Sequence, residues 1–259
     1  MPPDPLTAEP HPEPLELWCA YPDDLLDASV AAACADLLTP DEQARCEQLR
    51  FEPNRREFLA SRALVRIALS HHHPIPPEAW RFRATSHGKP ETDPACGLSF
   101  NISNTPGLVV CLIARGAQVG IDAEPYARAA EILPLAPDVL SLGEQAQLHA
   151  LPAEARPDRA LSLWTLKEAY IKARGLGLSL PLARFSFLFG GVPGIHLEID
   201  PALGDTPGRW RFRLLDHAGH RIALLAALPA EPALQLWESR LFAAPPRQLP
   251  LPPEPWFPR

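Results

Sequence analysis

Two segments far apart in this chain resemble each other closely enough to be aligned without gaps. Residues 100–114 read FNISNTPGLVVCLIA, and residues 212–226 read FRLLDHAGHRIALLA. In both, a polar turn containing Gly separates apolar runs, which is typical of a β-hairpin. Each is also preceded by a helical stretch and a W-R-F-R string, at 80–83 and 210–213. A chain that repeats such a unit is constrained to a duplicated architecture.

We therefore predict an α+β fold of two similar halves, each with helices packed on a small antiparallel sheet. Chance similarity of two apolar hairpins is the alternative explanation of the repeat. The apolar strand that begins at Val119 would open the second half. The folded part is accordingly divided into an N-terminal half, residues 15–118, and a C-terminal half, residues 119–242.

Prolines mark the two ends of the chain. There are 33 of them, and they concentrate near the N-terminus and the C-terminus. Because proline favours extended backbone, such segments rarely join a core. We expect residues 1–14 to be disordered and residues 243–259 to form an extended tail, with Trp256 and Phe257 still packing against the body.

The composition argues against several functional classes. The formal net charge is −7, which disfavours general nucleic-acid binding. No run of about 18 apolar residues is present, so no membrane span is expected, and residues 1–10 lack the features of a secretory signal. The five cysteines are irregularly spaced without C-x-x-C, which argues against zinc or a disulfide framework and fits a reducing cytoplasm.

A short strand ends in two acidic residues. Residues 107–114 and 119–124 read as successive apolar strands. Strand side chains alternate between faces, so Asp122 and Glu124 share one face. Two carboxylates on one face repel each other unless a cation lies between them. Pro125 then interrupts ladder pairing, which places the acidic pair at a strand exit.

An amphipathic helix is predicted over residues 159–174, which lack Pro and Gly, with Gly175 as the residue that ends it. Glu168 lies on an apolar stripe with Trp164, at helical spacing. A carboxylate on such a stripe is costly without a partner, and a metal ion would be one. Lys172 lies one helical turn beyond Glu168.

Neither motif is specific by itself, since a D-x-E pair is usually solvated and K-E-x-x-x-K is an ordinary helix-surface pattern. Together, in two apolar elements, they supply three oxygen ligands for a hard divalent cation and a lysine for a phosphate. The combination indicates phosphoryl-type chemistry on a soluble substrate.

The two segments resemble the signature of the 4′-phosphopantetheinyl transferases, in particular the larger, monomeric Sfp type that activates peptide and polyketide synthases. That signature is G-[IV]-D-x-E, followed about 40 residues later by W-[ST]-x-K-E-[AS]-x-x-K and often by G-x-G-L. The matching residues are Gly120, Asp122, Glu124, Trp164, Lys167, Glu168, Lys172, Gly175, Gly177 and Leu178. Residues 55–66, 88–90 and 100–103 also match, so the resemblance covers most of residues 39–185.

The resemblance implies a reaction. A serine hydroxyl of an apo acyl or peptidyl carrier protein attacks the phosphorus of coenzyme A that bears pantetheine, and 3′,5′-ADP leaves. Asp122, Glu124 and Glu168 would hold Mg²⁺, with Mn²⁺ as an alternative. Glu168, as base either directly or through a metal-bound water, and Lys172, on the pyrophosphate, would be catalytic. The family has its active site between two similar halves, and we expect a cytoplasmic monomer.

The resemblance also implies residues that contact coenzyme A. They are Arg45, Arg62, Lys89, Ser103, Asn104 and Lys172. The family usually has histidine where this chain has Asn104, and Glu42 replaces a basic residue. Asparagine can donate a hydrogen bond but carries no charge. Glu144, which follows Ser141, is explained by a helix capping box.

Two other functions remain open from the sequence. One is an Mg²⁺-dependent hydrolase of coenzyme A or nucleotide pyrophosphates, and the other is a non-catalytic binder of carrier proteins. The intact acidic and basic residues of the signature argue against the binder. The sequence does not select among carriers of fatty-acid, polyketide or non-ribosomal peptide synthesis. Residues 133–142 and the region after Glu124 are candidate docking surfaces for them.

Overall fold

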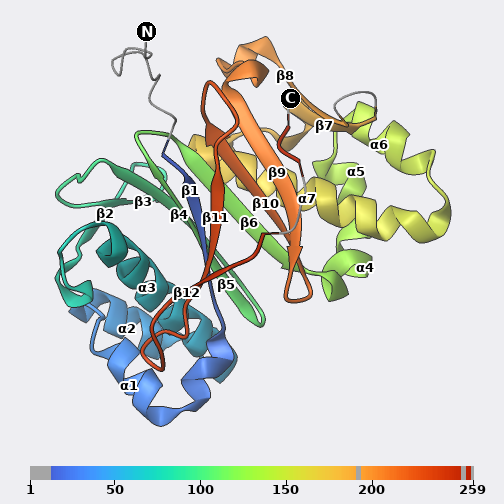
Figure 1. The fold of residues 1–259 in the computed structure, drawn as a ribbon. Helices are drawn as coiled ribbons and strands as arrows, with labels where there is room; N and C mark the ends of the chain where they lie inside the picture. Colours follow the sequence, from blue (N-terminus) through green and yellow to red (C-terminus); the bar gives the residue numbers. More distant parts are fainter. Residues whose placement is uncertain (1–12, 191–193, 252–254, 258–259) are drawn as a thin grey trace, which may run out of the picture.

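The computed structural model of the chain describes residues 13–190, 194–251 and 255–257. Residues 1–12, for which disorder is expected, lie outside the described part. Figure 1 shows two sheets in the middle of the molecule, with helix α3 beside one and helix α7 beside the other.

The first sheet has five strands in the order β12-β11-β1-β5-β4. They are β1 (Leu15–Ala20), β4 (Leu98–Thr105), β5 (Leu108–Arg115), β11 (Leu234–Glu238) and β12 (Arg247–Leu249). β1 is antiparallel to β5 and parallel to β11, so a late segment of the chain returns to the first sheet. Helix α3 (Glu52–His72) packs on this sheet, and α1 (Ala28–Ala35) and α2 (Pro40–Gln48) pack on α3.

The second sheet has three strands in the order β6-β10-β9, with β6 (Val119–Pro125), β9 (Trp210–His217) and β10 (His220–Ala227). Helix α7 (Arg156–Arg174) packs on β6 and β10. It begins earlier than predicted because Pro157 is tolerated in a first turn, and it ends at Gly175 with φ 64°, as predicted. Between β6 and α7 the chain forms α4 (Ala129–Ile132), α5 (Ala136–Val139) and α6 (Leu142–His149).

The two halves repeat one order of elements. Each runs from a strand through a long helix and a two-stranded sheet to a hairpin. The two-stranded sheets are β2 (Phe82–Ala84) with β3 (Pro90–Thr92), and β7 (Phe185–Phe189) with β8 (Ile195–Ile199). Leu98 pairs with Arg115 and Trp210 with Ala227, which is the gap-free register of the sequence repeat. The predicted duplicated α+β fold is confirmed.

The W-R-F-R strings do not belong to this duplication. Residues 80–83 follow a 3₁₀ turn and enter β2, whereas residues 210–213 begin β9. The two strings therefore occupy different places in their halves, and their similarity carries no structural equivalence.

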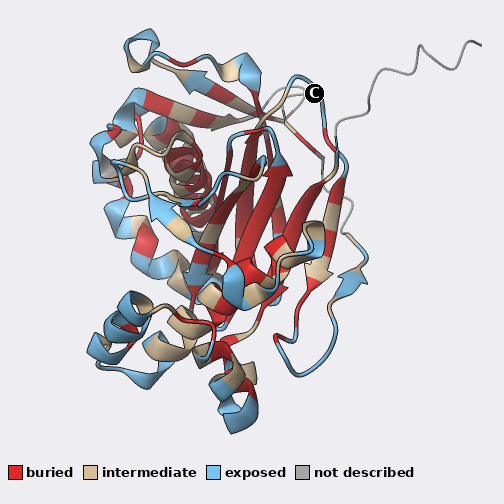
Figure 2. Cartoon of the chain, turned by 90° about the vertical axis from the view of Figure 1, so that its left-hand side faces the viewer, coloured by how far each residue is buried: buried red, intermediate tan, exposed pale blue. Residues whose placement is uncertain are grey.

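Alternation along the strands divides the core into three layers. Ile121 and Ala123 of β6 point into a cluster between the two sheets. Val109 and Cys111 of β5 point the other way, into a cluster beneath α3. Both faces of these strands are consequently buried, as Figure 2 shows. The alternate residues of β6, which include Asp122, face α7.

The C-terminal segment packs against the body where it is described. Trp256 is buried, and Phe257 exchanges backbone hydrogen bonds of 2.7 and 2.8 Å with Phe212 of β9. This agrees with the prediction for the two aromatic residues. Within the described ranges, every helix is too short or too polar to cross a membrane.

Candidate active site

Gly120 allows helix α7 to approach strand β6 closely. A Cβ atom on Gly120 would lie 2.1 Å from the carbonyl oxygen of Ala169 and 2.7 Å from the Cβ of Ala173. Side chains cannot occupy that space, so the position requires glycine. The close packing sets the polar side of α7 against the acidic end of β6.

Asp122 is buried in a three-way contact between the halves. Lys172 Nζ of α7 lies 2.6 Å from Asp122 Oδ1, and Ser103 Oγ of β4 donates to the same oxygen at 2.8 Å. Lys172 Nζ also donates to Ser103 Oγ at 3.0 Å. The second oxygen, Asp122 Oδ2, is buried and has no hydrogen-bond partner among the described residues. A buried carboxylate oxygen without a partner is a candidate ligand for a cation.

Glu124 is held by a different cation. Arg128, one turn further along the chain, donates to both Glu124 oxygens, at 2.8 and 2.6 Å. Trp164 Nε1 of α7 donates to Glu124 Oε1 at 3.0 Å. Arg128 is not among the site residues predicted from the sequence, although its spacing of four residues from Glu124 was an available signal.

Glu168 is the third carboxylate of the site, and it interacts electrostatically with Asp122 and Glu124. Burial, then the charge of Asp122, raises the pKa of Glu168, and Glu124 adds to the rise while Lys172 opposes it. Burial and Asp122 likewise raise the pKa of Glu124, against the effect of Arg128. In the described part of the chain, no three acidic, His or Cys side chains already surround a common point. The carboxylates are thus close enough to interact but are not preassembled.

A cavity of about 260 Å³ opens beside Glu168 and Lys172 at the junction of the halves. The first half contributes His87, Gly88, Lys89, Pro90, Asn101 and Ile102, and the second half contributes Glu168, Ile171, Lys172, Gly175 and Gly177. Asn101 Oδ1 also accepts from the Ile121 amide at 2.8 Å, which ties β4 to β6. Most of the residues predicted from the sequence therefore meet between the halves.

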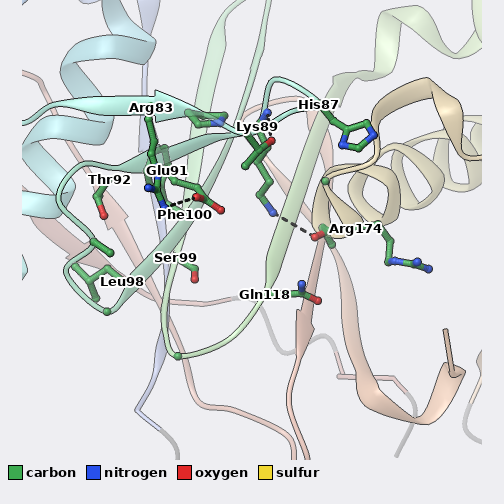
Figure 3. A pocket seen from close by; sticks show the side chains of 17 residues that line it. Arg83, His87, Lys89, Glu91, Thr92, Leu98, Ser99, Phe100, Gln118 and Arg174 are labelled. Carbon is green, nitrogen blue, oxygen red and sulfur yellow. Dashed lines mark hydrogen bonds and ion pairs between the residues drawn. The ribbon is translucent and has the colours of Figure 1, made fainter. Parts of the chain in front are cut away.

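Lys89 joins the two halves through its ammonium group. Its Nζ donates to the carbonyl oxygens of Val119, at 2.9 Å, and Ala173, at 3.2 Å. Burial lowers the pKa of Lys89 to about 8. Figure 3 shows its side chain between this junction and a neighbouring cavity of about 440 Å³, with Arg83 and Arg174 on the walls. The predicted approach of Lys89 to coenzyme A stays a prediction, because this ammonium is bound to backbone here.

Arg62, one of the basic residues predicted to contact coenzyme A, is paired with an acidic residue. Glu42 of α2 lies 3.3 Å from Arg62 Nε and 2.7 Å from Arg66, whose side chain is fully buried. Arg45 is exposed on α2, and its charge adds to the burial that lowers the pKa of Arg62. Glu42, which replaces a basic family residue, thus acts as a counterion for two arginines of α3.

Asn104 lies at the exposed end of β4. It hydrogen-bonds to the carboxylate of Glu57 on α3, which opposes the burial that raises the pKa of Glu57. Among the described residues, Asn104, Arg45 and Arg62 are not part of the wall of the 260 Å³ cavity.

Glu144 has a second role that the sequence analysis missed. The predicted capping box is confirmed, since Ser141 N donates to Glu144 Oε2 at 2.8 Å and Glu144 N donates to Ser141 Oγ at 3.3 Å. Lys167 Nζ also lies 2.8 Å from Glu144 Oε2, and both side chains are fully buried. Lys167 further donates to the carbonyls of Leu182 and Phe185, so it fixes α7 to α6 and β7.

Two protein-family models match the chain. Residues 118–225 match the 4′-phosphopantetheinyl transferase superfamily, and residues 27–116 match the N-terminal region of 4′-phosphopantetheinyl transferases. The boundary between the two matched ranges lies between β5 and β6.

Curated relatives carry the same description. The chain is 27% identical over 218 residues to the 4′-phosphopantetheinyl transferase Sfp of Bacillus subtilis, covering 84% of this chain and 95% of that one. It is 30% identical over 197 residues to a phosphopantetheinyl transferase of Thraustochytrium sp., covering 69% and 67%. It is 33% identical over 148 residues to the 4′-phosphopantetheinyl transferase HetI of Nostoc sp., covering 56% of this chain and 62% of HetI.

Proposed function

This chain belongs to the 4′-phosphopantetheinyl transferase superfamily, and we propose that it transfers 4′-phosphopantetheine from coenzyme A to a serine of an apo carrier protein. The serine oxygen forms a bond to the phosphorus that bears pantetheine. The bond from that phosphorus to the bridging oxygen breaks, and 3′,5′-ADP leaves. The observation that carries this proposal is the meeting of Lys172 with three interacting carboxylates beside a cavity between the halves.

A divalent metal ion fits the donor set of this site. Asp122, Glu124 and Glu168 offer the carboxylate oxygens that Mg²⁺ prefers, and Asp122 Oδ2 is buried without a partner in the described part of the chain. These three residues would hold Mg²⁺, or Mn²⁺ in its place. The bound ion would stabilise negative charge on the pyrophosphate.

Three polar residues of the site would contact the reacting groups: Lys172, Ser103 and Glu168. Lys172 would bind the pyrophosphate as a point charge, and Ser103, which already lies 3.0 Å from Lys172 Nζ, would donate to a phosphate oxygen. Glu168 would accept the proton of the attacking serine, either directly or through a water molecule, because the same carboxylate would also hold the metal ion. Without a bound metal ion, burial and two acidic neighbours raise the pKa of Glu168.

The first half would supply the other contacts to coenzyme A. We assign these contacts to Arg45, Arg62, Lys89 and Asn104. In this division, residues 15–118 contribute to coenzyme A binding and residues 119–242 hold the metal and the catalytic groups. The protein would act as a monomer, because the two halves of one chain already form the site, and we propose the cytoplasm as its location.

Exposed apolar residues in the segment between β6 and α7 suit the carrier protein. Leu142 is 85% exposed, and Leu135 and Tyr126 are also exposed. All three lie in the segment between β6 and α7, close in sequence to Glu124 and Arg128. Exposed apolar residues of this kind suit an interaction surface, and we assign carrier docking to them.

Release of 3′,5′-ADP tests the reaction and separates it from hydrolysis. Coenzyme A and Mg²⁺ are incubated with the protein, with and without an apo carrier protein, and the products are separated by chromatography. A transferase releases 3′,5′-ADP only when the carrier is present. Equal release without the carrier would instead establish a pyrophosphate hydrolase.

A further inference from the structure

Both acidic residues of β6 already hold a cation that belongs to the chain. Lys172 Nζ lies 2.6 Å from Asp122 Oδ1, and Arg128 NH1 lies 2.6 Å from Glu124 Oε2. A metal ion held by the same carboxylates would stand close to both positive groups, which would repel it. The two ion pairs therefore compete with the metal.

The side chains of Lys172 and Arg128 are exposed enough to move away from the carboxylates. The Lys172 side chain is 28% exposed and the Arg128 side chain is 40% exposed, whereas the carboxylates they cover are 7% and 8% exposed. Asp122 and Glu124 are fixed in a sheet strand, while lysine and arginine have long, flexible stems. Displacement would therefore move the cations and leave the carboxylates in place.

We propose that Lys172 and Arg128 are displaceable counterions, which keep the metal site weak until the diphosphate of coenzyme A draws them away. Lysine binds phosphate as a point charge, and the arginine fork binds it through two parallel hydrogen bonds. Moving both groups onto the diphosphate frees the carboxylate oxygens. This inference rests on the proposed function, because it requires the metal and the diphosphate.

The competition has a consequence in the absence of coenzyme A. Removing either cation should expose a carboxylate and tighten metal binding, although the same change removes a group that binds substrate. In the presence of coenzyme A, the difference in metal affinity between each variant and wild type should be smaller, because the two cations of the wild-type protein have already moved to the diphosphate. Coupling of this kind is reciprocal, so the metal should also tighten coenzyme A binding to the wild-type protein.

Manganese titration tests the competition without any turnover. Free Mn²⁺ is followed by electron paramagnetic resonance for the wild-type protein, Lys172→Met and Arg128→Met, without coenzyme A. We expect each variant to bind Mn²⁺ about 3- to 10-fold more tightly than wild type. Arg184→Met is the matched control, because it also removes one positive charge but from a pair with Asp200. It should leave Mn²⁺ affinity within about twofold of wild type.

Unchanged or weaker Mn²⁺ binding in Arg128→Met would overturn the proposal, and this exposed variant decides the case if Lys172→Met fails to fold. An equal gain in Mn²⁺ affinity in Arg184→Met would also overturn it. The tighter binding would then come from the loss of any one positive charge, not from the loss of a counterion in the site. The outcome is separable from the proposed function. A wild-type protein that modifies a carrier, together with unchanged Mn²⁺ affinity in both variants, refutes only this inference. A wild-type protein that neither transfers nor binds Mn²⁺ refutes both.

Discussion

Lys167 and Glu144 form an ion pair at 2.8 Å in which both side chains are fully buried. The pair lies behind the catalytic face of α7, because Lys167 precedes Glu168 and points to α6 and β7. Its position suggests that it fixes the rotation of α7, and thereby the direction in which Glu168 and Lys172 point.

Loss of one partner of this pair should destabilise the protein. Lys167→Met leaves Glu144 charged and buried, which costs about 3 to 5 kcal/mol in the free energy of unfolding. Urea unfolding measures the change. Arg83→Met is the control, since its pair with Glu91 is exposed and is worth less than about 1 kcal/mol. A loss no larger than that of the control would contradict the structural role of the pair.

Gly120→Ala should push α7 away from β6. The new Cβ would overlap the backbone carbonyl of Ala169, which lies 2.1 Å from its position. We expect a loss of more than about 2 kcal/mol in the free energy of unfolding, together with lower kcat. Gly208→Ala is a matched control, because no described atom lies within 4 Å of its Cβ position. Similar stability for the two variants would show that the helix and strand are not in close contact.

Asn104→His should keep or improve the affinity for coenzyme A. Histidine can carry the positive charge that asparagine lacks, and Glu57 lies beside it to favour that charge. Isothermal titration calorimetry with coenzyme A measures the affinity, and Asn104→Ala reports the loss of the amide alone. A large loss of affinity in Asn104→His would mean that the end of β4 is placed differently relative to coenzyme A than the family resemblance implies.

The buried ammonium of Lys89 should make stability depend on pH. Its pKa is about 8 in the folded protein and ordinarily 10.5, so the unfolded chain binds more protons between these values. The contribution of Lys89 to the free energy of unfolding therefore rises between pH 8 and pH 10.5, and it is lowest below pH 8. Relative to Lys89→Met, the free energy of unfolding of wild type should increase by up to about 3 kcal/mol from pH 8 to pH 10.5. Parallel pH profiles for the two proteins would contradict this.

Local pattern was enough to predict the duplicated hairpins and the helix of the second motif. Alternating apolar residues and a glycine turn set the register of β4 with β5 and of β9 with β10. The end of α7 followed from Gly175, which adopts the left-handed conformation that glycine favours. These features depend on neighbours in the chain, which the sequence displays directly.

Contacts between distant segments could not be read in the same way. The parallel pairing of β11 with β1 and the bonds from Lys89 to Val119 and Ala173 depend on how the halves pack. Lys167 appeared only as a motif position, because nothing in a helical pattern identifies Glu144 as its partner. The ion pair between Lys172 and Asp122 was likewise not predictable, because the sequence pattern pairs Lys172 with a phosphate.

Intact-mass spectrometry of an apo carrier protein tests the central claim most directly. The carrier is incubated with coenzyme A, Mg²⁺ and either wild-type protein or Glu168→Gln, and a carrier with its serine replaced by alanine is the control. The account predicts that wild type adds the mass of one phosphopantetheine group to the native carrier, that Glu168→Gln adds little or none, and that the serine-free carrier is unmodified. No mass gain on any of a panel of carriers, or an equal gain with Glu168→Gln, would contradict it.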